Sequence, residues 1–282
     1  MILVGEHGDY SWNEQGQQLF PRKFFMEQIC GVFATSGRSV PIFSDKHLSW
    51  SWDDAVWMVE RARELQAPFM AGSSLPLTHR SPDLEHPLDC PLEEAVAVGH
   101  SGLDVYGSHT LDILQCMTER RKGGESGVRA VTYMCGSAVW QAGKEGVFSM
   151  ELLRAACSAI DPPPEGDIEE RCALPDLILI EHLDGFRSAI LMLNGYINTL
   201  AYAGRVGGGV RMIQACEFRA GGSTPHAGPG PRPKHWLDNA LGGRSPFWRY
   251  YGHFAYFPRT LRRVSAHTHH HLPLHRVQRV RL

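Results

Sequence analysis

Three polar residues that can carry charge or exchange protons, Asp45, Lys46 and His47, follow a short apolar run after one serine, Ser44. A carboxylate, an ammonium and an imidazole side by side can hydrogen-bond a substrate and move its protons. The preceding residues, 40–43, are apolar and partly β-branched, which is typical of a buried strand. Ligands of open α/β sheets bind at the carboxyl ends of the strands. The pattern indicates a candidate site there, and a solvated strand-to-helix loop is the alternative.

The residues that follow are expected to form a helix that holds this strand end in place. Ser51 is a favourable N-cap residue, and the carboxylates of Asp53 and Asp54 suit the positive end of a helix. Apolar residues then recur at helical spacing as far as Leu65. Strand, polar loop and helix together form half of a βαβ unit.

Two similar strands are predicted on either side of this unit. Residues 2–5 begin as a strand and are followed by Glu6, His7 and Asp9, while residues 67–71 form a third strand. A helix is expected between the first two strands. The alternation of strands and helices predicts a partial Rossmann-like α/β unit with a parallel sheet over residues 1–75.

The pattern changes after residue 75. Residues 76–91 contain four prolines and are expected to cross between two domains. Asp184-Gly185 is a strong hairpin signal between two apolar runs. Residues 92–218 are therefore predicted as an α+β domain with a mostly antiparallel open sheet. Strands are expected at 95–98, 128–134, 176–182, 186–193, 198–206 and 210–218, with helices at 103–121 and 150–160.

The last part of the chain, residues 219–282, has a different composition. Gly, Pro, Arg and His dominate, and Asp238 is its only acidic residue. We expect a low-complexity, disordered tail, with a basic tail for phosphate-rich partners or a histidine metal cluster as alternatives.

The composition of the 282 residues limits the class of protein. A formal net charge of −2 argues against a general nucleic-acid binder, and no apolar run approaches the roughly 20 residues of a membrane span. The seven cysteines are scattered without a C-x-x-C pair, which is typical of reduced thiols in a cytoplasm. We therefore expect a cytoplasmic protein without a membrane or specific nucleic-acid partner.

Residues 1–218 resemble the glucose–fructose oxidoreductase / inositol dehydrogenase (Gfo/Idh/MocA) family. Residues 2–7 resemble the family's fourth Rossmann strand and the loop after it. Asp45-Lys46-His47 stands where the family has Glu-Lys-Pro, and residues 102–114, which include His109, resemble its Gly-Gly…Asp-x-Gly-x-His helix start.

The resemblance implies an NAD(P)-dependent oxidoreductase that acts on a sugar or cyclitol hydroxyl and forms a homo-oligomer through the C-terminal sheet. It implies that Lys46 hydrogen-bonds the reacting hydroxyl, that His109 relays its proton, and that Asp104 is the acid beside them. We expect Lys46 and His109 to line one cleft between the two domains. The residues implied on the cofactor side are Gly5, Glu6, His7, Asp45 and His47.

The sequence also departs from the family pattern. It contains no Gly-x-Gly-x-x-Gly turn, so no helix N-terminus is offered to a pyrophosphate in the usual way. We therefore expect a chain that begins partway through a Rossmann domain, a truncated form that binds NAD(P) poorly or not at all. The family's acid four residues before its histidine is Val105 here, with Asp104 one step away, and His47 replaces the proline.

Two other functions remain open. A pseudo-enzyme or small-molecule-binding protein would keep the cleft without a cofactor. A metal-dependent hydrolase would use mixed nitrogen and oxygen ligands at the strand ends. The candidate metal ligands are His7, Asp9, Asp45, His47, His79 and His109.

Overall fold

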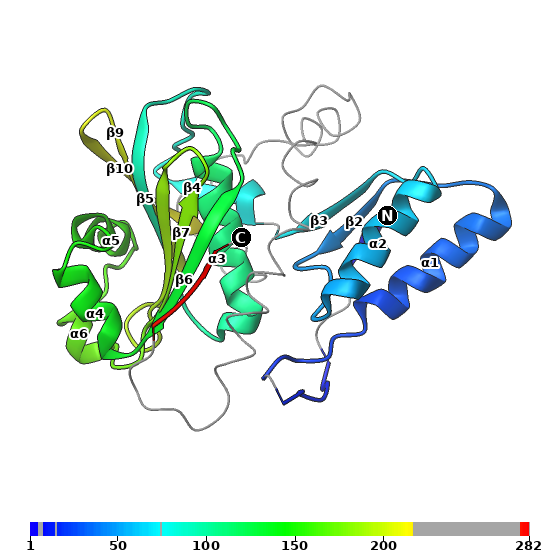
Figure 1. Ribbon diagram of the computed structural model, residues 1–282, viewed down its shortest axis with the longest axis horizontal. Helices are drawn as coiled ribbons and strands as arrows, with labels where there is room; N and C mark the ends of the chain where they lie inside the picture. The colour runs from blue at the N-terminus through cyan, green and yellow to red at the C-terminus, as the bar shows by residue number, and fades with distance from the viewer. Residues whose placement is uncertain (5–7, 15, 74, 217–276, 282) are drawn as a thin grey trace. The chain divides into compact units, whose positions relative to one another are not determined.

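The computed structural model describes residues 1–4, 8–14, 16–73, 75–216 and 277–281, and the chain divides into two compact units (Figure 1). Among the described residues, unit 1 comprises Met1–Ser11 and Leu19–Gly72, and unit 2 comprises the rest.

Unit 1 is a parallel three-stranded sheet with two helices. Ile2 pairs with Phe43 and Ile42 pairs with Phe69, both in parallel register, which gives the order β1-β2-β3. This confirms the predicted Rossmann-like parallel sheet. Its elements are β1 (Ile2–Leu3), α1 (Arg22–Ser36), β2 (Ile42–Asp45), α2 (Trp52–Glu64) and β3 (Phe69–Gly72).

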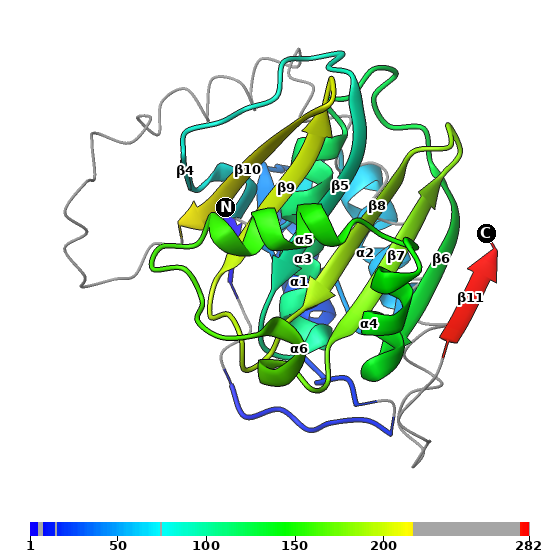
Figure 2. The ribbon, with the colours of Figure 1, turned by 90° about the vertical axis from the view of Figure 1, so that its left-hand side faces the viewer.

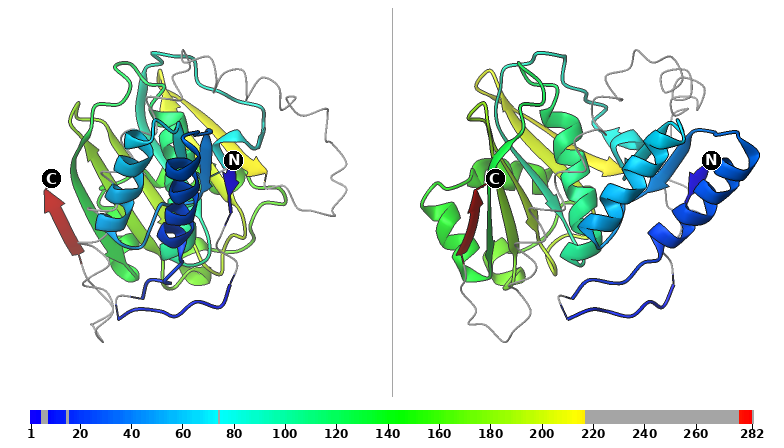
Figure 3. Two further views of the ribbon diagram at one scale, coloured as in Figure 1. Left: turned by 90° about the vertical axis from the view of Figure 1, so that its right-hand side faces the viewer. Right: turned by 45° about the vertical axis from the view of Figure 1, so that its right-hand side comes forward.

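One hydrophobic cluster joins both helices of unit 1 to its sheet. Met26 of α1, Met58 of α2 and Ile42 of β2 are fully buried in it. The helices lie side by side (Figure 3). Ser51 caps α2 as predicted, because its hydroxyl accepts the N–H of Asp54. The cap fixes where α2 begins and so ends the polar loop after β2.

Unit 2 is built on an eight-stranded sheet of order β11-β6-β7-β8-β5-β9-β10-β4. Only the β5–β8 pair is parallel among its described strands, so the mostly antiparallel sheet is confirmed. The β7–β8 hairpin turns at Gly185, whose φ of 87° favours glycine. The strands are β4 (His79–Ser81), β5 (Leu92–Gly99), β6 (Val128–Cys135), β7 (Asp176–His182), β8 (Arg187–Met192), β9 (Leu200–Val206), β10 (Gly209–Cys216) and β11 (Val277–Arg281).

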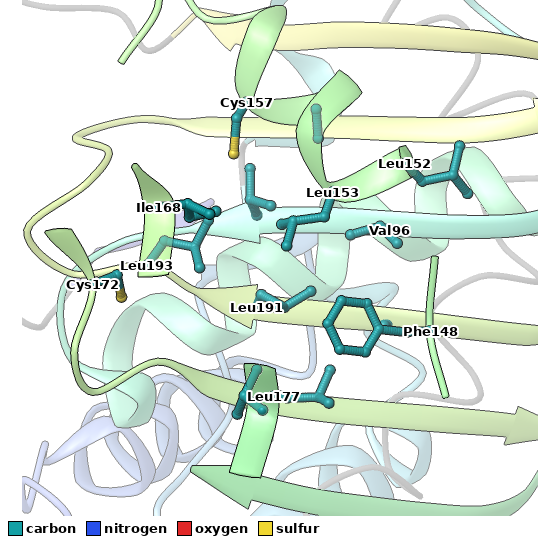
Figure 4. Close-up of a cluster of buried hydrophobic side chains, with 14 of the residues drawn as sticks. Val96, Phe148, Leu152, Leu153, Cys157, Ile168, Cys172, Leu177, Leu191 and Leu193 are labelled. Carbon is teal, nitrogen blue, oxygen red and sulfur yellow. The ribbon is translucent and has the colours of Figure 1, made fainter. Parts of the chain in front are cut away.

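Helices cover both faces of this sheet. In Figure 2, α4, α5 and α6 lie in front of it and α3 lies behind it. The main core is on the α4–α6 side, where Leu153 of α5 and Phe148 pack on Val96, Leu177 and Leu191 of the strands (Figure 4). The helices are α3 (Leu103–Thr118), α4 (Ser137–Lys144), α5 (Met150–Ser158) and α6 (Ile168–Arg171), with a 3₁₀ turn at Leu75–Leu77.

Several elements were absent from the sequence-based prediction. β4 lies inside the proline-rich segment 76–91 and pairs with β10 at the edge of the sheet. The helices α4 and α6 were also not predicted. Of the predicted tail, only residues 277–281 are described, and they form β11 along β6. None of the described helices is long and apolar enough to cross a membrane.

Candidate active site

Lys46 is held at the carboxyl end of β2 in an unusual backbone conformation. Its φ is 66°, a left-handed value that costs energy for a residue with a side chain. Its N–H donates to the carbonyl of Gly72 at 2.8 Å, which ties the end of β2 to the end of β3. Its Nζ lies 2.8 Å from Oδ2 of Asp45, and both side chains are mostly buried. The strand end therefore presents a positioned ammonium with its own counter-charge.

His47 completes the predicted polar group of unit 1. Its half-buried ring meets the ring of Phe20 edge-on at 6.4 Å between centroids. The structure thus brings Asp45, Lys46 and His47 together at the end of a parallel strand. Their catalytic and cofactor-binding roles stay predictions. Gly5, Glu6 and His7, which we expected at the end of β1, lie outside the described residues.

His109 of unit 2 lies in the first half of α3 and is buried, with 7% of its surface exposed. Its Nδ1 lies 2.5 Å from Oγ of Ser73. The ring of Tyr106, one turn earlier, meets it edge-on at 5.6 Å. On its other side Tyr106 packs against His100 at 5.1 Å. The imidazole is therefore buried, packed against one aromatic ring and within hydrogen-bond distance of a hydroxyl.

Ser73 and Asp112 join His109 in this cluster, and sequence reasoning missed both. The backbone N–H of Ser73 donates to Oδ2 of Asp112 at 2.5 Å, and its Oγ accepts the N–H of Leu75 at 3.0 Å. His109 and Asp112 are three residues apart and so share one face of α3. The spacing of His109 and Asp112, together with a serine shortly after a predicted strand, was the sequence signal that could have predicted this cluster.

A close approach between α3 and β5 fixes how near the helix segment that carries His109 lies to the sheet. A Cβ atom at Gly99 would lie 2.1 Å from Oγ1 of Thr110, so only glycine lets the helix come this near. Asp104, in the first turn of α3, accepts the N–H of Gln18 at 3.2 Å. Its predicted role as the acid beside His109 stays a prediction.

The structure gives no support to the metal-dependent alternative. The described residues contain no group of three or more His, Cys, Asp or Glu side chains that could hold a metal ion. His79 is exposed on β4, and His7 lies outside the described residues.

The described residues of unit 1 do not fit the pyrophosphate of a dinucleotide. The N-terminus of α2 is capped by Ser51 and carries the carboxylates of Asp53 and Asp54, which repel an anion. The N-terminus of α1 follows a long segment at Pro21 rather than a tight glycine turn after a strand. Neither described helix therefore offers the pyrophosphate cradle of a Rossmann fold.

Comparison with known proteins places the fold. No protein-family model matches the chain, and no curated protein sequence matches it. Among solved structures, GenD2 from gentamicin A biosynthesis, in complex with NAD, is 13% identical over 93% of this chain and 75% of its own, with a TM-score of 0.53. The chain has the fold of the Gfo/Idh/MocA oxidoreductases. The resemblance found in the sequence is thus confirmed for the fold.

Two further solved structures match over the same share of this chain at TM-scores below 0.5. A putative dehydrogenase from Bordetella bronchiseptica RB50 is 12% identical and is covered over 81% of its length, with a TM-score of 0.49. The WlbA dehydrogenase from Bordetella pertussis, in complex with NADH and UDP-GlcNAcA, is 12% identical and covered over 76%, with a TM-score of 0.46.

Proposed function

We propose that the chain is a Gfo/Idh/MocA-type oxidoreductase that acts on a hydroxyl of a sugar or cyclitol. The observation that carries this proposal is the Asp45–Lys46 pair. Its ammonium is held at the carboxyl end of a parallel strand by a left-handed backbone, in a chain with the fold of NAD-dependent dehydrogenases. Non-glycine residues in strained conformations are concentrated at functional sites.

The proposed roles follow from the chemistry of the side chains. Lys46 hydrogen-bonds the reacting oxygen and stabilises negative charge that develops on it. Asp45 supplies the counter-charge at 2.8 Å and orients the ammonium. His109 exchanges a proton with the substrate, since imidazole changes charge near neutral pH. Asp104 stands in the first turn of the same helix, one position from the family's acid.

NAD(P) would supply the hydride acceptor of such a reaction, and we propose that this chain binds it weakly. The support is the missing pyrophosphate cradle among the described residues, together with the absence of a Gly-x-Gly-x-x-Gly turn from the sequence. Gly5, Glu6, His7, Asp45 and His47 are the residues proposed on the cofactor side. Isothermal titration with NAD⁺ and NADP⁺ tests this, and micromolar or tighter affinity for either would contradict weak binding.

Turnover is the test of the oxidoreductase proposal. A panel of sugars and cyclitols is assayed with high concentrations of NAD⁺ and NADP⁺, following the absorbance of the reduced nicotinamide. Lys46→Met should lower kcat about 10²- to 10³-fold, the usual loss for a positioned charge-stabilising donor. Lys23→Met, which removes a more exposed lysine paired with Asp54 in the same unit, is the matched control and should leave kcat unchanged. Equal activity of wild type and Lys46→Met would sink the proposal.

A second candidate function is a small-molecule-binding protein without catalysis. The misfit of the described helix N-termini to a pyrophosphate favours it. Titration of the same sugars and cyclitols without cofactor separates the two functions: tight binding without turnover at any cofactor concentration supports the binding protein. A homo-oligomer formed through the sheet of unit 2 remains a prediction, which sedimentation equilibrium would test.

A further inference from the structure

The phenol ring of Tyr106 lies between two imidazole rings of unit 2. Its centre is 5.6 Å from the centre of the His109 ring, which it meets edge-on, and 5.1 Å from that of His100. Tyr106 and His109 are three residues apart on α3 and therefore share one face of the helix. Because a ring packs on each side, the phenol has little room to rotate and stays beside the imidazole that is proposed to exchange a proton.

The backbone that carries this ring is fixed as well. The carbonyl of Tyr106 accepts the hydroxyl of Thr110 at 3.1 Å, and Thr110 is the residue that packs against Gly99 of β5. The loop before α3 is clamped by the side-chain amide of Asn194, which accepts the N–H of Ser101 at 2.5 Å and donates to its carbonyl at 3.2 Å. A side chain held in place in this way loses little conformational entropy when a ligand binds to it.

The hydroxyl of Tyr106 has hydrogen-bonding capacity that the described part of the chain does not use. Its side chain packs against the two imidazole rings, and within the described residues its hydroxyl makes no hydrogen bond. A phenol hydroxyl can both donate and accept. The side chain is half-buried, whereas His109 is 7% exposed. A ligand that reaches the imidazole therefore lies beside a phenol hydroxyl with which it can form a hydrogen bond.

We propose that Tyr106 is a substrate-binding residue whose hydroxyl hydrogen-bonds the hydroxyl group on the carbon next to the reacting one. The proposal rests on the proposed function, which places His109 against the reacting hydroxyl. Two hydroxyls on adjacent ring carbons can meet the imidazole and the phenol at the same time, because the centres of the two rings are only 5.6 Å apart. Tyr106 therefore selects sugars or cyclitols that carry a second hydroxyl beside the reacting one.

Titration with matched ligands tests this selection. Isothermal titration without cofactor compares myo-inositol and D-glucose with their monodeoxy analogues, each of which lacks one hydroxyl. In wild type, an analogue that lacks a hydroxyl bound by the protein should bind about tenfold more weakly than its parent compound, the effect of one hydrogen bond. Tyr106→Phe keeps the ring and removes only the oxygen, so a single position on the ligand should lose this tenfold difference.

A second variant shows which hydroxyl the imidazole contacts. In His109→Leu the position that loses its tenfold difference is that of the hydroxyl at His109. It should be adjacent, on the ligand ring, to the position identified by Tyr106→Phe. Should His109→Leu fail to fold, the carbon that is oxidised during turnover marks the same position, and Tyr106→Phe still decides whether the phenol binds a substrate hydroxyl.

Tyr196→Phe is the matched control. Tyr196 is also partly buried in unit 2, but it packs against the hydrophobic core on the α4–α6 side of the sheet, so every affinity ratio should remain as in wild type. Wild-type ratios throughout in Tyr106→Phe would overturn the proposal, and so would two positions that are not adjacent. A chain that discriminates as expected but turns over no substrate would contradict only the proposed function. No binding of either parent compound would contradict both.

Discussion

The two units of the chain place their charged side chains in opposite ways. In unit 2 the buried Arg121 joins the end of α3 to the β7–β8 hairpin through Asp184, and the charge holds the fold together. In unit 1 the Asp45–Lys46 pair joins adjacent residues, and Lys46 adopts a left-handed backbone to sit beside its partner. In unit 1 the backbone adopts a strained conformation to position the charge of Lys46. In unit 2 the charge of Arg121 stabilises the fold.

Arg121 should therefore give the largest loss of stability. Its side chain is 3% exposed, and its guanidinium donates to Asp184 at 2.8 and 3.0 Å, to Oγ of Ser126 and to the carbonyl of Thr118. It also lies 4.6 Å from the ring centre of Phe186. Arg121→Met should lower the free energy of unfolding of unit 2 by about 2–3 kcal/mol, because the buried guanidinium loses its hydrogen bonds to Asp184 and to the two other acceptors.

Urea denaturation followed by hydrogen exchange and mass spectrometry of peptides from unit 2 measures this loss. The double variant Arg121→Met/Asp184→Asn should recover little of it, since the exposed carboxylate of Asp184 is hydrated once Arg121 is removed. Arg129→Met is the control, because Arg129 is exposed and donates to the carbonyl of Leu183, and it should change stability by less than about 0.5 kcal/mol. A loss as small as that in Arg121→Met would show that the Arg121–Asp184 pair does not stabilise unit 2.

The second prediction is that unit 2 has a pH-dependent stability with two opposing parts. Burial, with repulsion from Glu125, raises the pKa of Glu119 from 4.5 to about 9. The folded state then keeps a proton that the unfolded state releases, so stability falls as pH rises toward 9. Burial, with repulsion from Arg121, lowers the pKa of His182 from 6.5 to about 4. The unfolded state then binds the extra proton, so stability falls as pH drops from 6.5 toward 4.

Between pH 4.5 and 6.5 the rise from His182 opposes the fall from Glu119, and His86, whose pKa burial also lowers, adds to the rise. Above pH 6.5 the fall from Glu119 is no longer opposed by these histidines, so the free energy of unfolding should decline there. The decline is at most about 1.4 kcal/mol per pH unit, less where solvent reaches Glu119. Glu119→Gln should abolish it and expose the acid-side slope of His182, worth up to about 3 kcal/mol. The exposed Glu165→Gln serves as control. An alkaline decline that persists in Glu119→Gln would assign it to another group.

Much of this fold could be predicted from sequence because its signals are local. The run at Ile42 with the cap at Ser51 gave β2 and α2, and Asp184-Gly185 gave the β7–β8 hairpin because its turn needs a positive φ at Gly185. β4 (His79–Ser81) escaped because it is a three-residue edge strand without apolar alternation. An edge strand is specified by its neighbour, β10, which lies far away in the sequence.

The candidate site also has a part that local sequence signals predict and a part that depends on residues far apart in the sequence. Asp45, Lys46 and His47 are adjacent in sequence, so the strand end that carries them could be recognised directly. The Ser73–His109 bond joins residues 36 positions apart, and it forms only because the segment after β3 packs on α3. The left-handed conformation at residue 46 could not be predicted either. Glycine is the usual sequence signal for a positive φ, and this position is a lysine.

The last and smallest prediction isolates the backbone strain at Lys46. Lys46→Gly and Lys46→Ala both delete the ammonium, so their difference in stability reports the left-handed backbone rather than the ion pair. The glycine variant should be more stable than the alanine variant by about 1 kcal/mol, because a Cβ atom is disfavoured at positive φ. Gln66 provides the matched control, since it is exposed, lies in the same unit and has a φ of 51°.

Gln66→Gly and Gln66→Ala should differ by the same amount, measured by urea denaturation with hydrogen exchange of peptides from unit 1 as the probe. The two sites should then diverge in function: Lys46→Gly should lose turnover, whereas Gln66→Gly should keep it. Strain at Gln66 would be a structural cost that glycine relieves without loss, and strain at Lys46 would be kept because the ammonium is needed there. If Lys46→Gly were no more stable than Lys46→Ala, the left-handed conformation would cost no free energy. Lys46 would then not be held in a strained backbone, and unit 1 would not differ from unit 2 in this respect.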